Sequence, residues 1–139
     1  MVLGELIVEE RGKITGQRVL DVEGPKIEAS MVMEGKYRGI DTTEIATYWS
    51  VPCEGTMYGE WLGVVTTKDG QEMATWTGQG IGKSTGGRSR FHGSIFFKTS
   101  PKAQFPSGGK LLFLNNMVGV FEFETDEQGN CSAKVWEWK

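Results

Sequence analysis

The fold is decided by residues 56–99, which read TMYGEWLGVVTTKDGQEMATWTGQGIGKSTGGRSRFHGSIFFKT. Asp69-Gly70 and Gly86-Gly87 divide this stretch into three pieces of strand length, and such dipeptides form tight hairpin turns. Within each piece, residues of different size and polarity alternate, as in a strand that buries one face. The stretch therefore predicts three antiparallel strands, over 56–67, 71–83 and 88–99.

The two turns also predict which residues face one another. With Asp69-Gly70 as a two-residue turn, Trp61 lies opposite Gly78, and Trp76 lies opposite Gly63. Aromatic rings over glycines are a feature of curved sheets, because the glycine permits the bend and the ring fills the space. We expect this face to line the interior. Its residues are Gly59, Trp61, Gly63, Trp76, Gly78, Gly80, Gly93, Ile95 and Phe97.

Similar turn signals recur along the rest of the chain, and no long window has the apolar period of a helix. Eight to ten antiparallel strands with no helix to cover a face predict one closed, lipocalin-like β-barrel over residues 1–139. The further turn signals are Arg11-Gly12, Gly24-Pro25, Asn115-Asn116 and Gly129-Asn130. The remaining expected strands are 4–10, 13–22, 26–37, 43–51, 110–114, 117–125 and 131–138.

Aromatic side chains are expected to close the barrel at the C-terminal hairpin. Whichever dipeptide containing Gly129 forms the turn, two phenylalanines and two tryptophans share one face. Core packing explains this stripe better than stacking on a ligand. The four residues are Phe121, Phe123, Trp136 and Trp138.

Composition and charge exclude several classes of protein. A chain of 139 residues with a net charge of -3 has the size of one domain and lacks the basic footprint of a nucleic-acid binder. The first residues, MVLGE, include an acidic residue and lack the basic segment followed by an apolar run that begins a signal peptide. We therefore expect neither a signal peptide nor a membrane span. We expect a cytoplasmic protein, in which Cys53 and Cys131 are reduced thiols.

No motif indicates a cofactor. One histidine and no closely spaced cysteine pair leave too few ligands for a metal site. Residues 78–84 (GQGIGKS) resemble a phosphate-binding loop, but Thr77 stands where that loop requires its first glycine. No helix is expected to follow, so the N–H groups of a helix N-terminus are missing as well.

The opposite face of the three central strands holds the groups that could carry chemistry. Glu60 and His92, with Tyr58, are candidate catalytic residues, because a histidine and a tuned carboxyl can act as general acid and base. If the tryptophan face is inside, however, these groups and Gln79 face solvent or a subunit contact. Either a partner then covers this face or the assignment is reversed, because it also carries much apolar surface. The apolar residues are Leu62, Val64, Ile81 and Phe96.

Several short segments match a known kind of small barrel: Tyr58-Gly59-Glu60, Gly86-Gly87-Arg88, Phe91-His92-Gly93-Ser94, 109–115 and 119–123. In glycine placement and hairpin order they resemble the barrels related to allene oxide cyclase. The resemblance implies an eight-stranded, lipocalin-like barrel, often self-associating, with an apolar cavity open at one end. Allene oxide cyclase is an isomerase, and dirigent proteins of similar shape steer the coupling of bound radicals. No catalytic residue of either matches this sequence, so neither activity is implied.

The sequence favours a small-molecule binding barrel that holds an apolar or aromatic metabolite. The expected ligand-binding residues are Trp49, Trp61, Trp76, Met33 and Gln79. One alternative is a cofactor-free isomerase, cyclase or lyase that uses Glu60 and His92 in the cavity. A second is a structural oligomer with a packed interior. We also expect a homo-oligomer, a dimer or trimer, and a loop over 100–109 that acts as a lid at the barrel mouth.

Overall fold

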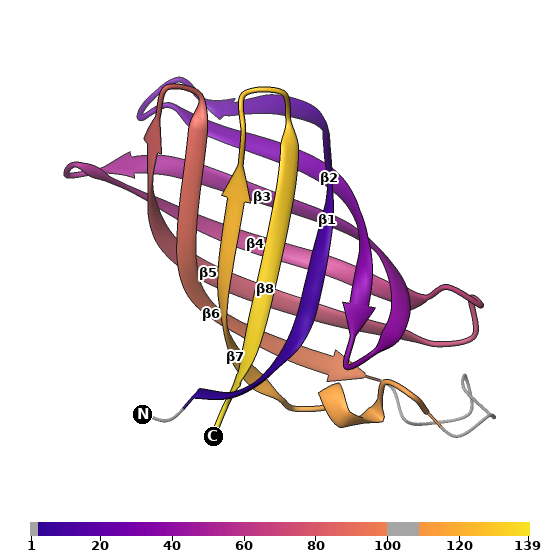
Figure 1. Cartoon of the computed structure of the whole chain (residues 1–139). Helices are drawn as coiled ribbons and strands as arrows, with labels where there is room; N and C mark the ends of the chain where they lie inside the picture. Colours follow the sequence, from indigo (N-terminus) through magenta and orange to yellow (C-terminus); the bar gives the residue numbers. More distant parts are fainter. Residues whose placement is uncertain (1–2, 100–108) are drawn as a thin grey trace.

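The computed structural model describes residues 3–99 and 109–139, which form one closed antiparallel barrel of eight strands (Figure 1). The strands are β1 (Leu3–Asp21), β2 (Lys26–Tyr37), β3 (Ile40–Cys53), β4 (Thr56–Thr67), β5 (Met73–Thr85), β6 (Arg88–Thr99), β7 (Val118–Thr125) and β8 (Asn130–Trp138). Each strand pairs with its neighbours in sequence, and β8 closes on β1. The predicted single antiparallel barrel is confirmed. No helix among the described residues could cross a membrane.

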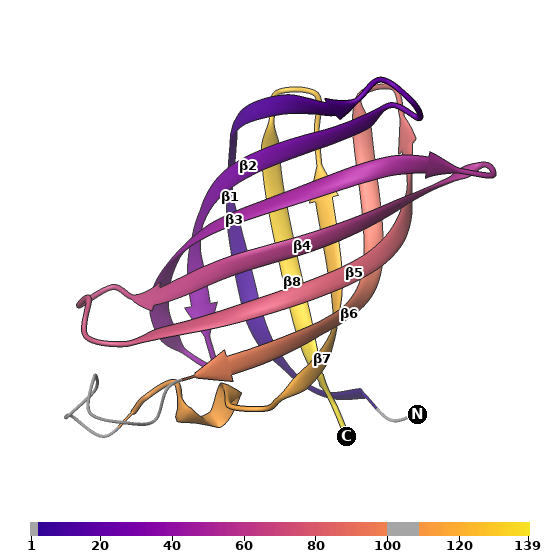
Figure 2. The same cartoon turned by 180° about the vertical axis from the view of Figure 1, so that it is seen from behind.

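The register predicted for β4, β5 and β6 is confirmed. Trp61 pairs with Gly78, and Trp76 pairs with both Gly63 and Phe97. These strands run side by side across the wall that faces the viewer in Figure 2. The tryptophan face points inward, since Trp61 and Trp76 are buried, so the inside–outside assignment is not reversed.

The predicted break at Arg11-Gly12 is wrong, because β1 is one strand that continues through both residues. The strand bends here instead of turning. A Cβ atom added at Gly12 would meet the Val32 carbonyl oxygen of β2 at 1.9 Å. The two backbones are therefore too close here for any amino acid that has a side chain. The glycine therefore marks a close approach of β1 and β2 within the sheet.

The strand predicted over 110–114 is also wrong. This segment contains a 3₁₀ turn, η1 (Leu112–Leu114), below the end of the barrel where β1 begins and β8 ends (Figure 1). Leu111 and Leu114 are three residues apart and both are buried, which is the spacing of one face of such a turn. The apolar residues thus cover a barrel end. The predicted lid loop lies almost wholly outside the described residues.

The C-terminal hairpin has a different register from the expected one. Phe121 pairs with Val135, so the aromatic stripe that joins Phe121 to Trp136 does not exist. The Asp126 N–H bonds to the Asn130 carbonyl oxygen, so three residues, 127–129, lie between this pair. The last of them, Gly129, has a φ of +81°, whereas a two-residue turn was expected. One extra loop residue shifts the pairing and moves Trp136 and Trp138 to the other face.

An aromatic cluster fills much of the interior. Trp61 stacks on Tyr48 with ring centroids 5.2 Å apart, and Phe91 meets the same indole edge-on at 5.1 Å. Phe121 and Phe123 of β7 complete the cluster. Aromatic pairs in these geometries add about 1 kcal/mol each beyond their buried area. The interior near Trp61 is therefore a packed aromatic wall.

Candidate functional site

The expected catalytic residues lie on the outer surface of the barrel. Glu60 and His92 are exposed, and Tyr58 donates a hydrogen bond to Glu60 Oε2 at 2.7 Å. The Tyr58 hydroxyl also lies 3.1 Å from Gln79 Oε1. Its hydrogen bond to Glu60 raises the pKa of Tyr58, because the carboxylate holds the phenolic proton. Acid–base chemistry by Glu60 and His92 inside the barrel has no support in this geometry.

Two of the expected ligand-binding residues are likewise outside. Trp49 pairs with Glu60, and its ring meets Tyr58 edge-on at 5.7 Å, while the Lys26 ammonium lies 4.0 Å from its centroid. Trp49 follows the inward-pointing Tyr48, so alternation turns it outward. Gln79 also points outward, so neither residue lines an interior site.

The other three ligand-binding candidates are inside. Trp61, Trp76 and Met33 are buried and belong to one continuous apolar core. Their positions match the sequence-based expectation for the interior. What the sequence reasoning missed is the polar group that lies beside them.

That polar group is a pair of buried carboxyls, Glu10 of β1 and Glu44 of β3, which are 7% and 3% exposed. Glu44 Oε1 accepts a hydrogen bond of 2.6 Å from the Tyr37 hydroxyl. Met33 lies between the two strands and pairs directly with Glu44. The interior of this barrel therefore contains two acids in contact with aromatic and thioether side chains.

Burial shifts the titration of both acids. The pKa of Glu10 rises well above its ordinary value, first because burial penalises its charge and then because the Glu44 carboxylate repels that charge. A hydrogen bond to Glu44 adds to the rise. Burial also raises the pKa of Glu44, against contacts with Glu10, Tyr37 and Trp76 that favour its charged form. Both pKa values are therefore raised, so the pair keeps a proton above the ordinary range of a glutamate, and contact with Glu10 favours the charged form of Glu44.

In the described part of the barrel interior, three buried polar atoms have no hydrogen-bond partner: Glu10 Oε2, Trp61 Nε1 and Trp76 Nε1. The Trp76 indole lies beside Glu44, but its N–H makes no bond of good geometry. A buried polar atom without a partner typically costs about 1–3 kcal/mol. Such atoms are rare in folded proteins, and here three occur within one barrel interior.

No positive charge compensates the two acids. Within residues 3–99 and 109–139, no lysine, arginine or histidine is buried. The ion pairs of these segments join side chains that are at least partly exposed, such as Arg38 with Glu5 at 2.7 Å. The carboxyl pair is therefore an acidic site without a buried cation among the described residues.

The nearby Cys131 does not convert this site into a metal centre. Burial, and then the nearby Glu10, raise the pKa of Cys131 to about 11, which keeps the thiol protonated. Its Sγ lies 4.0 Å from Met31 Sδ. Both cysteines are free, as expected. In the part of the chain that the structure describes, no three histidine, cysteine or acidic side chains are placed to hold a metal ion.

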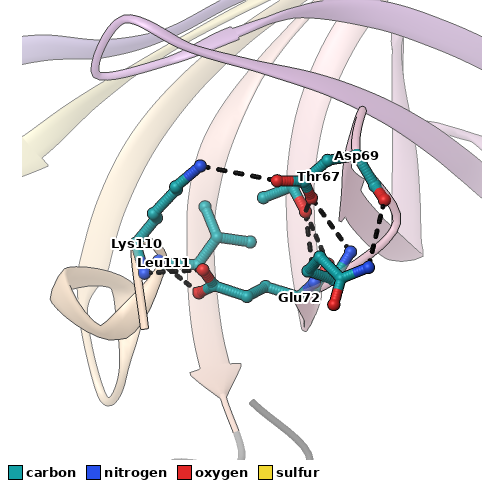
Figure 3. Close-up of polar contacts among 6 residues, drawn as sticks. Thr67, Asp69, Glu72, Lys110 and Leu111 are labelled. Carbon is teal, nitrogen blue, oxygen red and sulfur yellow. Dashed lines mark hydrogen bonds and ion pairs between the residues drawn. The ribbon is translucent and has the colours of Figure 1, made fainter. Parts of the chain in front are cut away.

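A third buried carboxylate, Glu72, has a structural role (Figure 3). Its two oxygens accept hydrogen bonds from the backbone N–H groups of Lys110 at 2.8 Å and Leu111 at 3.0 Å. Its own N–H donates to Thr67 Oγ1, whose hydroxyl bonds to Asp69. Glu72 therefore fastens the segment before η1 to the β4–β5 connection and holds the barrel end closed.

A large open depression of about 1710 Å³ crosses the outer surface. Consecutive residues line it, among them 9–13 of β1 and 32–36 of β2, so it follows the backbone and the outward side chains. Its charged residues are of both signs, for example Lys36 and Glu34. Its lining also includes Glu10 and Glu44, but the mixture of charges and the open shape select no particular ligand, so the buried carboxyl pair itself is the better candidate site.

Comparisons with protein-family models, curated proteins and solved structures give no significant match. The chemistry of the interior is therefore what points to a function.

Proposed function

We propose that this protein is a small-molecule binding barrel whose interior holds an apolar or aromatic metabolite. The observation that carries the proposal is the set of unpartnered polar atoms, Glu10 Oε2, Trp61 Nε1 and Trp76 Nε1, within an aromatic interior. A ligand with polar groups on an apolar body supplies their partners and gains from burial in the same step.

Flexible side chains beside the two acids can move to make space for a ligand. Met31 and Met33 are buried and belong to the same core as Trp61. Methionine has three rotatable bonds and adapts to irregular shapes, so it can repack around a ligand at lower cost than a branched or aromatic residue. The polar end of the site then lies at Glu10 and Glu44, and the aromatic rings form its walls.

Native mass spectrometry of protein purified from its own cells tests the proposal. The expected result is an added mass that denaturation releases. The Trp61→Phe variant should retain less of this compound, because it removes one unpartnered N–H while keeping an aromatic ring. If no compound is retained from cells and none from an added metabolite extract, the interior is a packed core and the structural role is favoured.

We propose in addition that a second copy of the chain covers the outer apolar face. Ile45, Leu62 and Phe96 are 68%, 60% and 50% exposed there, and Val64 pairs directly with Ile45. Solvent-exposed apolar groups of this size on neighbouring strands are uncommon in monomers. Light scattering should give the mass of a dimer or trimer, and Leu62→Lys should reduce it, whereas Lys83→Ser should not. A monomer at every concentration contradicts self-association.

A further inference from the structure

We propose that the interior site selects a ligand with a protonated amine on an apolar or aromatic body, and that Glu10 and Glu44 hold its ammonium group. This inference rests on the proposed binding function and adds the chemical class of the ligand. Its basis is the contrast between two acids and no base in the described interior.

The hydrogen-bonding capacity of the pair fits an ammonium group. Ionised carboxylates only accept hydrogen bonds, and an ammonium has three donors and no acceptor. Tyr37 uses one oxygen of Glu44, and Glu10 Oε2 has no partner. The pair itself thus keeps acceptor positions that an ammonium group can fill, and the unpartnered N–H groups of Trp61 and Trp76 are donors that this group leaves unchanged.

The charge of the pair fits as well. With one proton on Glu10, the pair carries a single negative charge on Glu44, which one ammonium neutralises without loss of that proton. An anionic ligand would meet repulsion from the same charge. A neutral ligand would leave the Glu44 carboxylate uncompensated.

Aromatic rings beside the acids favour a cation further. The Trp76 indole lies next to Glu44, and Tyr37 contacts Phe97 edge-on at 6.1 Å. The faces of such rings attract ammonium groups, most strongly where water is excluded. The apolar body of the ligand then lies against Met33 and the neighbouring core.

Three probes that differ only at the polar end test the inference: 2-phenylethylamine, 2-phenylethanol and phenylacetate. Each is titrated into the folded wild-type protein, with calorimetry and tryptophan fluorescence as readouts. We expect the amine to bind at least about tenfold more tightly than the alcohol, and phenylacetate to bind most weakly.

Matched variants locate the effect. Glu44→Gln should abolish the preference for the amine, because it removes the charge of the pair. If this variant loses fold integrity in thermal melts, Glu10→Gln, which removes one acceptor beside the same site, should weaken the preference. Glu60→Gln, which changes a carboxylate on the outer face, should keep the preference. If Glu60→Gln abolishes it instead, the amine binds the surface and the inference is wrong.

The outcomes separate this inference from the function on which it rests. If the amine and the alcohol bind equally, or phenylacetate binds best, the amine preference is refuted while interior binding stands. If none of the three binds and no compound is retained from cells, the binding function itself fails.

Discussion

Glu44 and Glu72 are equally buried, at 3% exposure each, yet the protein treats them in opposite ways. Glu72 receives two backbone N–H donors from residues that lie almost forty positions further along the chain. Glu44 receives one hydroxyl and lies against a second acid. The difference shows that burial alone does not identify a functional carboxylate. A buried carboxylate that accepts hydrogen bonds from the protein's own donors stabilises the fold, whereas one without enough donors can bind a ligand.

The largest expected effect comes from displacing the aromatic wall beside Glu44. A Cβ atom at Gly63 would lie 2.4 Å from Trp76 Cζ2, so Gly63→Ala must move a buried indole. We expect a loss of about 3 kcal/mol in the free energy of unfolding, measured in urea. Gly78→Ala is the control, because its Cβ would meet its nearest atom, the Ser94 carbonyl oxygen, at 3.0 Å. An equal loss in both variants would contradict this account of the wall.

The direct test of the comparison exchanges each acid for its amide. Glu72→Gln replaces one acceptor oxygen with an NH₂ group that faces a backbone N–H, so we expect a loss of about 2 kcal/mol in urea unfolding. Glu10→Gln removes a buried acid that lacks such donors, and we expect it to be neutral or stabilising near pH 7. If Glu10→Gln costs as much as Glu72→Gln, the two sites do not differ as described.

The pH dependence of stability sharpens the same contrast. Glu10 has a raised pKa in the folded protein, so above its ordinary value of 4.5 the native state keeps a proton that the unfolded chain releases. Stability therefore falls as pH rises from 4.5 toward the native pKa, by at most about 1.4 kcal/mol per pH unit. Glu10→Gln should reduce this slope in urea titrations between about pH 5 and 8, because only Glu44 then keeps a raised pKa in the pair. A stability difference between variant and wild type that stays constant with pH would refute the assignment.

The smallest effect is expected on the outer face. Tyr58→Phe deletes the hydrogen bonds to Glu60 and Gln79, which form at the surface where water replaces them. The thermal melt should show a change in stability below about 0.5 kcal/mol. A large loss would mean that this polar group is covered, as by a second copy of the chain.

The sequence predicted the barrel and the central register because both turns are centred on the dipeptides used for counting, although the Thr67 N–H bonds to the Glu72 carbonyl oxygen and gives the first loop four residues, 68–71. Asp69-Gly70 and Gly86-Gly87 fix the pairing of three strands, and Trp76 over Gly63 follows from counting. For the C-terminal hairpin, the same counting predicted the wrong register. Its loop is one residue longer, and Asp126 accepts hydrogen bonds from the Gln128 and Asn130 N–H groups to hold it.

The buried acids were missed for a related reason. β2 and β3 turn at Arg38-Gly39, where both residues have positive φ, and arginine is an unusual residue for that conformation. Had this turn been recognised, counting outward would have paired Glu44 with the buried Met33. Glu10 was beyond such counting, because β1 changes register near Leu6 and again after Ile14. Bulges of this kind give no clear signal in the sequence.

The protonation state of Glu10 is the most direct test of the central claim. In an NMR titration of the glutamate side-chain carboxyl carbons, with Glu10→Gln used to assign the signal, we predict that Glu10 stays protonated well above pH 4.5, the ordinary pKa of a glutamate. If Glu10 instead titrates near pH 4.5, the interior does not hold a proton-sharing acid pair, and the account of this site is wrong.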